Sequence, residues 1–517
     1  MGGVSKSSGK LDLRRRPRGR LLGVALLLSW QTPLLAADWH VQPRFLLSET
    51  YSDNIYLAPS GDKQDDFVTQ VNPGISVDGQ GKRVKARINY SLQNAMYASD
   101  SSLNVTNQHL NADGSAELVK NLFFMDARSS ISQQIADARG RVGLDNLNIG
   151  NQANVFTYGI SPYLKLRMAS FAKAELHFSD DHVENQSDSI SDAETQDYNA
   201  QIKSGSRFGR MQWDANYQQR DLLRSTVGDS HYQSANADIH YNLLSSWNLL
   251  VHGGYEDNSL PNIADPHNGS YWSAGLEWAP SSRFSASATT GDRNWDANLH
   301  LQPNMRTMLQ VSYRERDVGL VRGPSWNANL SHRTRHTTWS LTYSEESTTV
   351  QSLQVSGQQF FNLVDANGNL IVDPNTGQPV VLARNVFSLT DQDFIRKRGQ
   401  LAVNLKTGKS DVVMSVFSER RTYSLSNSSE DVVGTAESWT WRFAPRTSGM
   451  IGVGWQRRNP ANTDLHEDLW HGSFRLTHRL SPKSNASLEY AHLQNNSIAA
   501  YDNYVENRIV LQVSMRF

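Results

Sequence analysis

Apolar and polar residues alternate along most of this chain. In the segment 506–517 every second position from Ile509 onward is apolar, namely Ile509, Leu511, Val513, Met515 and Phe517. A period of two places the two sets of side chains on opposite faces of an extended strand. The same alternation recurs in residues 84–93, 272–278, 439–443 and 451–456. No helical periodicity of useful length interrupts it, so the pattern predicts an all-β protein.

Eleven short turn sequences separate the alternating segments. Proline, which fixes φ and cannot donate to a sheet, marks four of them, at Pro280, Pro303, Pro445 and Pro482. The others lie near residues 79–82, 120–121, 168–169, 208–209, 244–245, 333–334 and 408–409. Eleven short turns that alternate with longer polar loops give about 24 strands, within a range of roughly 22–26. Short periplasmic turns and longer extracellular loops are typical of bacterial transmembrane barrels.

Two architectures fit this alternation, a soluble β-sandwich and a closed antiparallel β-barrel in a membrane. Tryptophans on the apolar parity, often near strand ends, favour the barrel, because aromatic girdles mark a lipid–water interface. They are Trp213, Trp247, Trp278, Trp339, Trp439 and Trp455. No run of about 20 apolar residues could form a transmembrane helix, and the mean hydropathy is −0.54. We therefore expect residues 38–517 to form a single closed antiparallel transmembrane β-barrel.

The first 37 residues have the pattern of an export signal. Five arginines between Arg14 and Arg20 precede a short apolar stretch, and Leu35-Ala36-Ala37 offers a small-residue cleavage site. We expect residues 1–37 to be a signal peptide that is removed. Residues 38–517 then carry 43 basic and 50 acidic side chains, a net charge of −7. The chain has no cysteine, so no disulfide framework is expected.

Two stretches resemble known outer-membrane proteins. The alternating segment that ends on Phe517 resembles the closing strand of bacterial barrels, whose terminal phenylalanine is part of the signal read by the barrel-assembly machinery. Residues 49–59 (ETYSDNIYLAP), Asp65-Asp66 and residues 70–76 (QVNPGIS) are similar to the outer-membrane β-barrel family found with PEP-CTERM/exosortase exopolysaccharide gene clusters. This resemblance covers about 40 residues. It implies an outer-membrane location and an exopolysaccharide context, and it brings no catalytic residues.

No motif in the sequence indicates catalysis. The chain has no phosphate-binding glycine loop, no HExxH, no GxSxG and no histidine spacing for zinc. Residues 365–373 partly match a calcium loop, but Asn367-Gly368 reads better as a two-residue hairpin turn. We therefore expect no enzyme activity, cofactor or metal. The longest connection, residues 347–393, either stands above the barrel or folds into its lumen.

Arginines gather on the parity opposite to the apolar one, which would line the lumen. The candidates are Arg87, Arg220, Arg314, Arg316, Arg396, Arg398, Arg442 and Arg508. A basic bore would favour anionic solutes or anionic sugar chains. Alternatively, these arginines pair with carboxylates on neighbouring strands and stiffen the wall. The acidic excess is expected in loops, notably Asp180, Asp181, Glu184, Asp188, Asp192, Glu194 and Asp197.

The sequence thus favours a non-enzymatic outer-membrane pore or conduit associated with exopolysaccharide secretion. A structural or adhesive barrel with a filled lumen, whose loops bind surface polysaccharide, is the alternative. Expected partners are outer-membrane lipid and lipopolysaccharide, the barrel-assembly machinery, anionic exopolysaccharide and secretion-system proteins. Nucleic acid is not expected.

Overall fold

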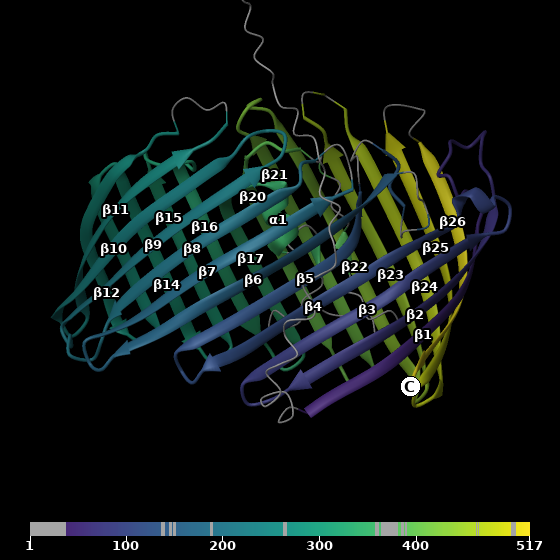
Figure 1. The fold of residues 1–517 in the computed structure, drawn as a ribbon, viewed down its shortest axis with the longest axis horizontal. Coiled ribbons are helices and arrows are strands. Elements are labelled where there is room, and N and C mark those ends of the chain that lie inside the picture. Colours follow the sequence, from purple (N-terminus) through teal and green to yellow (C-terminus); the bar gives the residue numbers. More distant parts are fainter. Residues whose placement is uncertain are drawn as a thin grey trace, which may run out of the picture.

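The structure confirms a closed antiparallel β-barrel of 24 strands (Figure 1). This computed structural model describes residues 38–135, 140–143, 147, 151–186, 190–261, 266–356, 361–362, 381–383, 387, 390–461, 463, 465–497 and 503–517. The predicted signal peptide, residues 1–37, lies outside them. Among the described residues, no helix is long and apolar enough to cross a membrane.

The wall consists of β1–β17 and β20–β26. Its first half is β1 (Asp38–Ser52), β2 (Asp66–Gln80), β3 (Val84–Tyr97), β4 (Val105–Val119), β5 (Phe123–Ile135), β6 (Gln152–Met168), β7 (Ala172–Asn185), β8 (Ala193–Ser204), β9 (Met211–Arg224), β10 (Ser230–Leu244), β11 (Trp247–Ser259) and β12 (Gly269–Ser281). The second half is β13 (Phe284–Asp292), β14 (Asn294–Asn304), β15 (Thr307–Arg316), β16 (Gly323–Arg333), β17 (Thr337–Thr348), β20 (Phe394–Lys406), β21 (Ser410–Tyr423), β22 (Ser429–Ala444), β23 (Thr447–Asn459), β24 (Glu467–Ser481), β25 (Ser484–Ser497) and β26 (Tyr504–Arg516). Three further elements are η2 (Ser101–Leu103), α1 (Val350–Ser356) and a separate pair of strands, β18 (Phe361–Asn362) and β19 (Val381–Ala383).

The ring closes between its first and last strands. β1 pairs antiparallel with β26, from Arg44 opposite Arg516 to Ser52 opposite Arg508. Every other wall strand pairs with its two neighbours in chain order, with β17 joined directly to β20. A closed ring leaves no unpaired strand edge, which is the condition for a sheet to sit in hydrocarbon.

The two ends of the barrel differ. All eleven expected turns lie at one rim, and each joins two strands through two to six residues. We call this end the turn rim; it also holds the C-terminus, at the bottom of Figure 1. The other end, the loop rim, carries the longer connections, although Arg293 alone, in the left-handed region at φ 59°, joins β13 to β14. Pro280 and Pro303 lie where the pairing register shifts by one residue, at bulges.

The register divides every strand into an outer and an inner face. Ile509, Leu511 and Met515 are exposed, and most of their cross-strand partners are apolar or aromatic, such as Phe45 and Leu488. All six expected tryptophans lie on the outer face, with Trp247, Trp278, Trp339 and Trp439 close to the turn rim. A closed sheet with an apolar outer band and aromatic belts is an outer-membrane architecture. The protein is therefore an outer-membrane β-barrel.

The expectation that the acidic excess lies in loops is wrong for five of its seven residues. Asp180, Asp181 and Glu184 belong to β7, and Glu194 and Asp197 belong to β8. Asp192 does lie in a connection, whereas Asp188 lies outside the described residues. These strands continue beyond the apolar outer band, which on β7 ends at Phe178. A polar strand extension has the composition of a loop, which is why sequence reasoning misplaced it.

Candidate functional site

All eight candidate arginines lie on the inner face of the wall, and seven of them form ion pairs. The pairs are Arg87–Asp78 (3.4 Å), Arg220–Asp197 (2.6 Å), Arg314–Asp296 (2.8 Å), Arg316–Glu256 (2.9 Å), Arg396–Glu419 (2.9 Å), Arg398–Glu419 (3.6 Å) and Arg508–Glu506 (2.5 Å). Arg442, exposed near the turn rim, forms no ion pair with a described residue. The carboxylates neutralise most of this charge, so the geometry favours the wall-stiffening role over a free basic bore.

The inner wall near the loop rim holds a buried charge network on β20–β23. Glu419 accepts from Arg396 at 2.9 Å and from Arg421 at 2.8 Å, and Arg458 donates to Glu430 at 2.8 Å. Each of these five side chains is at most 2% exposed. Burying charges is costly unless each is paired and hydrogen-bonded, so something must cover this part of the wall and hold it in one arrangement.

Part of the cover is a structure that crosses the bore, which we call the internal bridge. It consists of α1 and residues 390–393, the described parts of connection 347–393 that adjoin β17 and β20. Val350 and Leu353 of α1 pack with Phe394 and Tyr423 on the inner faces of β20 and β21. In the opposite direction, Gln354 Nε2 donates to Asn185 Oδ1 of β7 at 2.8 Å and to Gln134 Oε1 of β5 at 3.2 Å.

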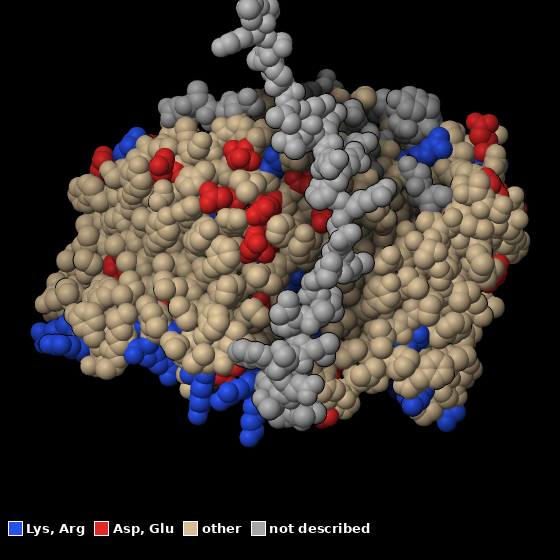
Figure 2. Space-filling model, in the orientation of Figure 1, with Lys and Arg blue, Asp and Glu red and all other residues tan. Residues whose placement is uncertain are grey.

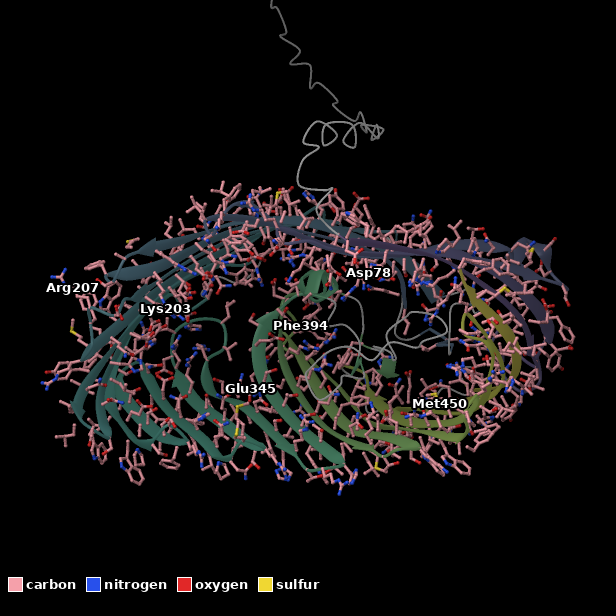
Figure 3. All side chains as sticks on the ribbon, turned by 90° about the horizontal axis from the view of Figure 1, so that it is seen from below. Asp78, Lys203, Arg207, Glu345, Phe394 and Met450 are labelled. Atoms are coloured by element: carbon pink, nitrogen blue, oxygen red, sulfur yellow. The ribbon has the colours of Figure 1, made fainter. Side chains whose placement is uncertain are left out.

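The bridge joins opposite walls. β6 is the sixth strand of the ring and β20 the eighteenth, so half of the 24 strands separate them in either direction. Figure 3, which looks onto the turn rim, shows a flattened ring with a helix inside it and Phe394 near its centre. The described parts of connection 347–393, namely α1 and residues 390–393, therefore lie in the lumen. This is one of the two arrangements that the sequence left open. Residues 365–373, with the partial calcium-loop match and the favoured hairpin turn, lie outside the described residues.

Residues 390–393 are anchored by a buried arginine of β9. The side chain of Arg224 is fully buried and donates to Asp393 Oδ2 at 3.2 Å and to the main-chain oxygen of Asp391. The hydroxyl of Tyr232 donates to Asp393 as well. Asp391 accepts from the backbone nitrogen of Ser191 at 3.0 Å and from Gln351 Nε2 of α1 at 2.6 Å. The Asp391 carboxylate therefore links α1 to the backbone of Ser191.

A second in-folded segment covers the wall on one side of the bridge. Val142, from the connection between β5 and β6, packs with Phe387, Phe417 and Val432. Its backbone nitrogen donates to the hydroxyl of Tyr504 at 3.0 Å. Leu147 of the same connection packs in a separate cluster against the inner wall of β2 and β3. The inner wall from β20 through β26 to β3 is thereby lined with apolar contacts near the loop rim.

The wall on the other side of the bridge is polar and partly exposed in the part of the chain that the structure describes. Side chains on the inner faces of β9–β17 are mostly half-buried, and the Arg314 side chain is 54% exposed although it is paired. Nearer the turn rim, Phe124, Tyr163 and His177 form a stacked ladder across β5–β7, with ring centroids 5.0 and 4.6 Å apart. The Lys165 ammonium lies over two of these rings at 5.5 and 5.4 Å. Polar and aromatic groups thus share this surface.

The residues that carry the family resemblance lock the closing seam at the loop rim. Asn507 donates to the Asp53 carboxylate from its backbone nitrogen at 2.7 Å and from its amide at 2.8 Å. Asn54 donates to the carbonyl oxygens of Ala58 at 2.7 Å and Val505 at 3.0 Å. Ser52 donates to Glu506 at 2.6 Å. The motif therefore joins β1 to β26 beyond the last strand pair. At the other end, Phe517 donates its backbone nitrogen to Pro43 at 2.9 Å and exposes its ring.

The turn rim carries a set of cations that we call the basic ring. Its members are the exposed Lys and Arg residues of the connecting segments: Lys82, Arg83, Lys120, Arg207, Arg210, Arg283, Arg306, Arg335, Lys409, Arg446 and Lys483. They occupy nine of the eleven turns, and no turn contains Asp or Glu. Figure 2 shows blue side chains along this lower edge. Sequence reasoning did not single out these cations, although they lie in turns that it predicted.

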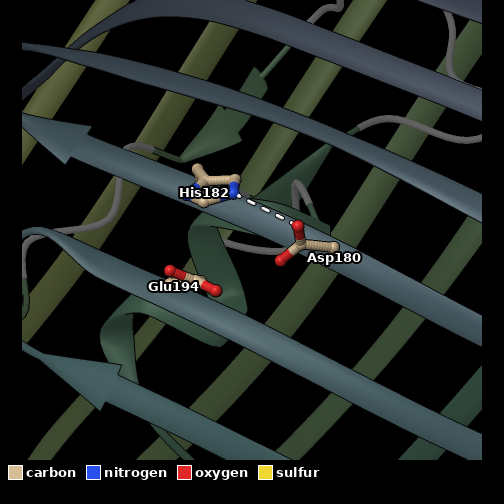
Figure 4. Close-up of side chains that lie close together, drawn as sticks. All are labelled: Asp180, His182 and Glu194. Carbon is tan, nitrogen blue, oxygen red and sulfur yellow. Dashed lines mark ion pairs between the residues drawn. The ribbon is translucent and has the colours of Figure 1, made fainter.

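One group of side chains on the outer wall could supply ligands to a metal. Asp180, His182 and Glu194 each offer an atom within 4.8 Å of the others (Figure 4). The register places His182 opposite Glu194, and His182 Nε2 lies 3.5 Å from Asp180 Oδ2. All three lie on the outer parity of β7 and β8, above the apolar band, so this group is separate from the bore.

The comparisons with known proteins give a remote likeness of fold. No protein-family model and no curated protein matches the chain. Among solved structures, a mutant of the ferric enterobactin receptor PfeA from Pseudomonas aeruginosa is 9% identical, with a TM-score of 0.43 over 92% of this chain and 80% of that one. The siderophore receptor PirA from Pseudomonas aeruginosa is 11% identical, with a TM-score of 0.41 over 92% and 80%. The FrpB iron transporter from Neisseria meningitidis is 9% identical, with a TM-score of 0.45 over 94% and 83%. Likenesses this remote carry no argument about what the chain binds or moves.

Proposed function

We propose that this protein is a non-enzymatic outer-membrane conduit for an extracellular polysaccharide, narrowed near the loop rim by the internal bridge. The observation that carries the proposal is the polar, partly exposed inner wall of β9–β17 beside a bridge held by a few specific contacts. A barrel whose lumen is filled would not need a polar, partly exposed inner wall.

The size of the ring suits this role. A circular ring of 24 strands, spaced about 4.8 Å apart and tilted about 40°, has a backbone radius of roughly 24 Å. Side chains and flattening reduce the free width, but a single sugar chain needs far less. The stacked ladder of Phe124, Tyr163 and His177 offers ring surfaces near the mouth. Sugar rings present flat C–H faces that pack against such surfaces.

The genetic context rests on the resemblance of residues 49–76 to barrels from PEP-CTERM/exosortase exopolysaccharide clusters. In that setting the partners would be secretion-system proteins on the periplasmic side, with the barrel-assembly machinery reading the strand that ends on Phe517. Lipopolysaccharide would contact the outer wall near the loop rim, where the apolar band gives way to polar residues.

A structural or adhesive barrel is the second candidate, and one observation favours it. Val142, Leu147 and Phe387 are each at most 7% exposed, so in-folded residues seal one part of the inner wall near the loop rim. In this role the loops would hold surface polysaccharide and nothing would pass through.

Release of trapped sugars from proteoliposomes separates the two candidates. Vesicles loaded with fluorescent dextrans of graded size would contain either the wild-type barrel or a variant in which a short Gly-Ser linker replaces residues 350–390. A conduit releases small dextrans through the wild type and larger ones through the variant. A filled barrel retains every size in both proteins, which would refute the conduit.

A further inference from the structure

The basic ring differs from the arginines inside the bore in forming no ion pairs with the described residues. None of its eleven members forms an ion pair with any residue that the structure describes. Inside the bore, by contrast, carboxylates lie within 3.6 Å of seven of the eight candidate arginines. The turn rim therefore carries a set of cations that form no ion pair with the described residues.

Exposed Lys and Arg residues also lie on the inner face of the strand ends at the turn rim, which we call the inner lip. The outer face of the same strand ends carries none. Lys85, Lys173, Lys203, Lys406, Arg442 and Arg479 are exposed on the inner faces of the strand ends next to the turns. Many of the corresponding outer positions of the described strands are apolar or aromatic, such as Met168, Trp247 and Phe443, and none is Lys or Arg. Carboxylates also lie on the inner wall, including Asp78 and Asp214. The excess of positive over negative charge at this rim therefore comes from the turns.

The spacing of the turns lets the charges act together. Adjacent hairpins are two strands apart, and with a tilt of about 40° this is roughly 12 Å along the rim. The Debye length is about 8 Å at physiological ionic strength and about 30 Å at 0.01 M. Fields from neighbouring turns therefore overlap partly in physiological salt and almost fully in dilute buffer. A mouth ringed by one sign of charge concentrates and steers ions of the opposite sign.

We infer that the turn rim captures a polyanion, and that the polysaccharide handled by this barrel is acidic, with carboxylate or similar groups along its chain. The inference rests on the proposed conduit for the direction of passage, because short turns face the periplasm in bacterial barrels. The acidic polymer enters at the basic ring, which faces the compartment from which export proceeds. Weak exposed contacts hold it without trapping it, because each contributes little and exchanges readily.

Anionic lipid headgroups are the other chemistry that a basic rim could meet. Headgroups surround the outside of a barrel, beside its aromatic belt. A collar for them would carry Lys or Arg on the outer positions of the strand ends, and these positions have neither. The cations instead stand on the turns and on the inner lip, around the opening. This arrangement fits a chain that passes through the mouth.

The test is the binding of polygalacturonate, whose charges are carboxylates, to the folded full-length barrel in neutral detergent at about 20 mM salt. Dextran of matched length is the neutral control. One variant removes four ring charges in four turns (K82Q/K120Q/K409Q/K483Q), and its matched control keeps them (K82R/K120R/K409R/K483R). At about twofold per exposed contact, four lost contacts should make the glutamine variant bind roughly 16-fold more weakly. The arginine variant should bind like the wild type, and physiological salt should weaken all three.

The same proteins in planar bilayers separate failure of this inference from failure of the conduit. Because the chain has no cysteine, S245C in an uncharged turn reports orientation through a membrane-impermeant thiol reagent. Polygalacturonate should block the current from the turn side more strongly than from the loop side. A barrel that binds polymer but never conducts would overturn the conduit alone. A conducting barrel that polymer blocks equally from both sides, or equal binding by the glutamine variant, would overturn the inference. If the glutamine variant loses binding to phosphatidylglycerol vesicles but still binds polygalacturonate like the wild type, the basic ring binds lipid instead.

Discussion

Replacing Arg224 with alanine should release the internal bridge from the wall. The Arg224 side chain is fully buried and Asp393 is 7% exposed, with 3.2 Å between the paired atoms. Arg224 also donates to Ser230 Oγ at 2.6 Å and to the carbonyl oxygen of Gly228 at 3.1 Å, which hold it in place without the bridge. The substitution therefore removes the anchor on β9 and leaves the Asp393 carboxylate buried beside Tyr232.

The expected effect is large because the pair is buried. Removing one partner of a buried ion pair costs about 3–5 kcal/mol, since the other charge stays uncompensated. When residues 390–393 leave the wall, Asp393 regains water and the penalty disappears, so the cost falls on the docked state alone. At about 1.4 kcal/mol per factor of ten, a cost of about 3 kcal/mol shifts docking roughly 100-fold toward the released state.

Thiol labelling measures that shift. Val350 of α1 is 1% exposed and the chain has no cysteine, so V350C reacts with a bulky maleimide only when α1 leaves its site. Labelling should accelerate roughly 100-fold in R224A, and D393N in that background should slow it again. The control is R420A, because the Arg420–Asp431 pair lies on the outer face with side chains 57% and 34% exposed and should matter little. Equal labelling in R224A and R420A would refute the anchoring role of Arg224.

Three further predictions concern the wall. Deleting Phe517 should reduce the amount of heat-modifiable barrel in outer-membrane fractions, and an unchanged amount would argue against its role in assembly. Replacing Trp439, exposed on the outer face near the turn rim, with arginine should lower the free energy of unfolding in vesicles by about 1–2 kcal/mol, less than at the bilayer midplane; no loss would place it away from lipid. Desolvation opposes ionisation of Asp53, but hydrogen bonds from Asn507 and Lys63 outweigh it and lower its pKa. Its stabilisation of the seam is therefore present at neutral pH and lost as the pH falls below about 4. D53A should unfold earlier than wild type at pH 7, and the difference should shrink at pH 3; an unchanged difference at pH 3 would contradict this.

The barrel could be predicted from sequence because its determinants are local. A period of two sets the face of each side chain, and turn chemistry sets where a strand ends. All eleven turns and the outer tryptophans followed from windows of a few residues. Two of the arginine pairings were also within reach, because Arg508–Glu506 and Arg421–Glu419 are two residues apart on one face of one strand. The alternation identified Arg508 as a lumen residue without revealing its partner, and it did not single out Arg421.

The bridge could not be predicted in this way. Arg224 and Asp393 are 169 residues apart, and Gln354 and Gln134 are 220 apart. Their meeting depends on the flattening of the ring and on which strands face each other across it, and no local pattern encodes either property. Arg224 stands at an ordinary strand end, and Asp391 and Asp393 lie in an unpatterned connection.

Single-channel current through the folded barrel in a planar bilayer tests the conduit most directly. We predict small, interrupted currents for the wild type, whose bore the bridge narrows. A Gly-Ser replacement of residues 350–390 should give larger and steadier currents, with the barrel still heat-modifiable. If both correctly folded proteins are silent, the bore is filled independently of the bridge, and the protein is a structural barrel and not a conduit.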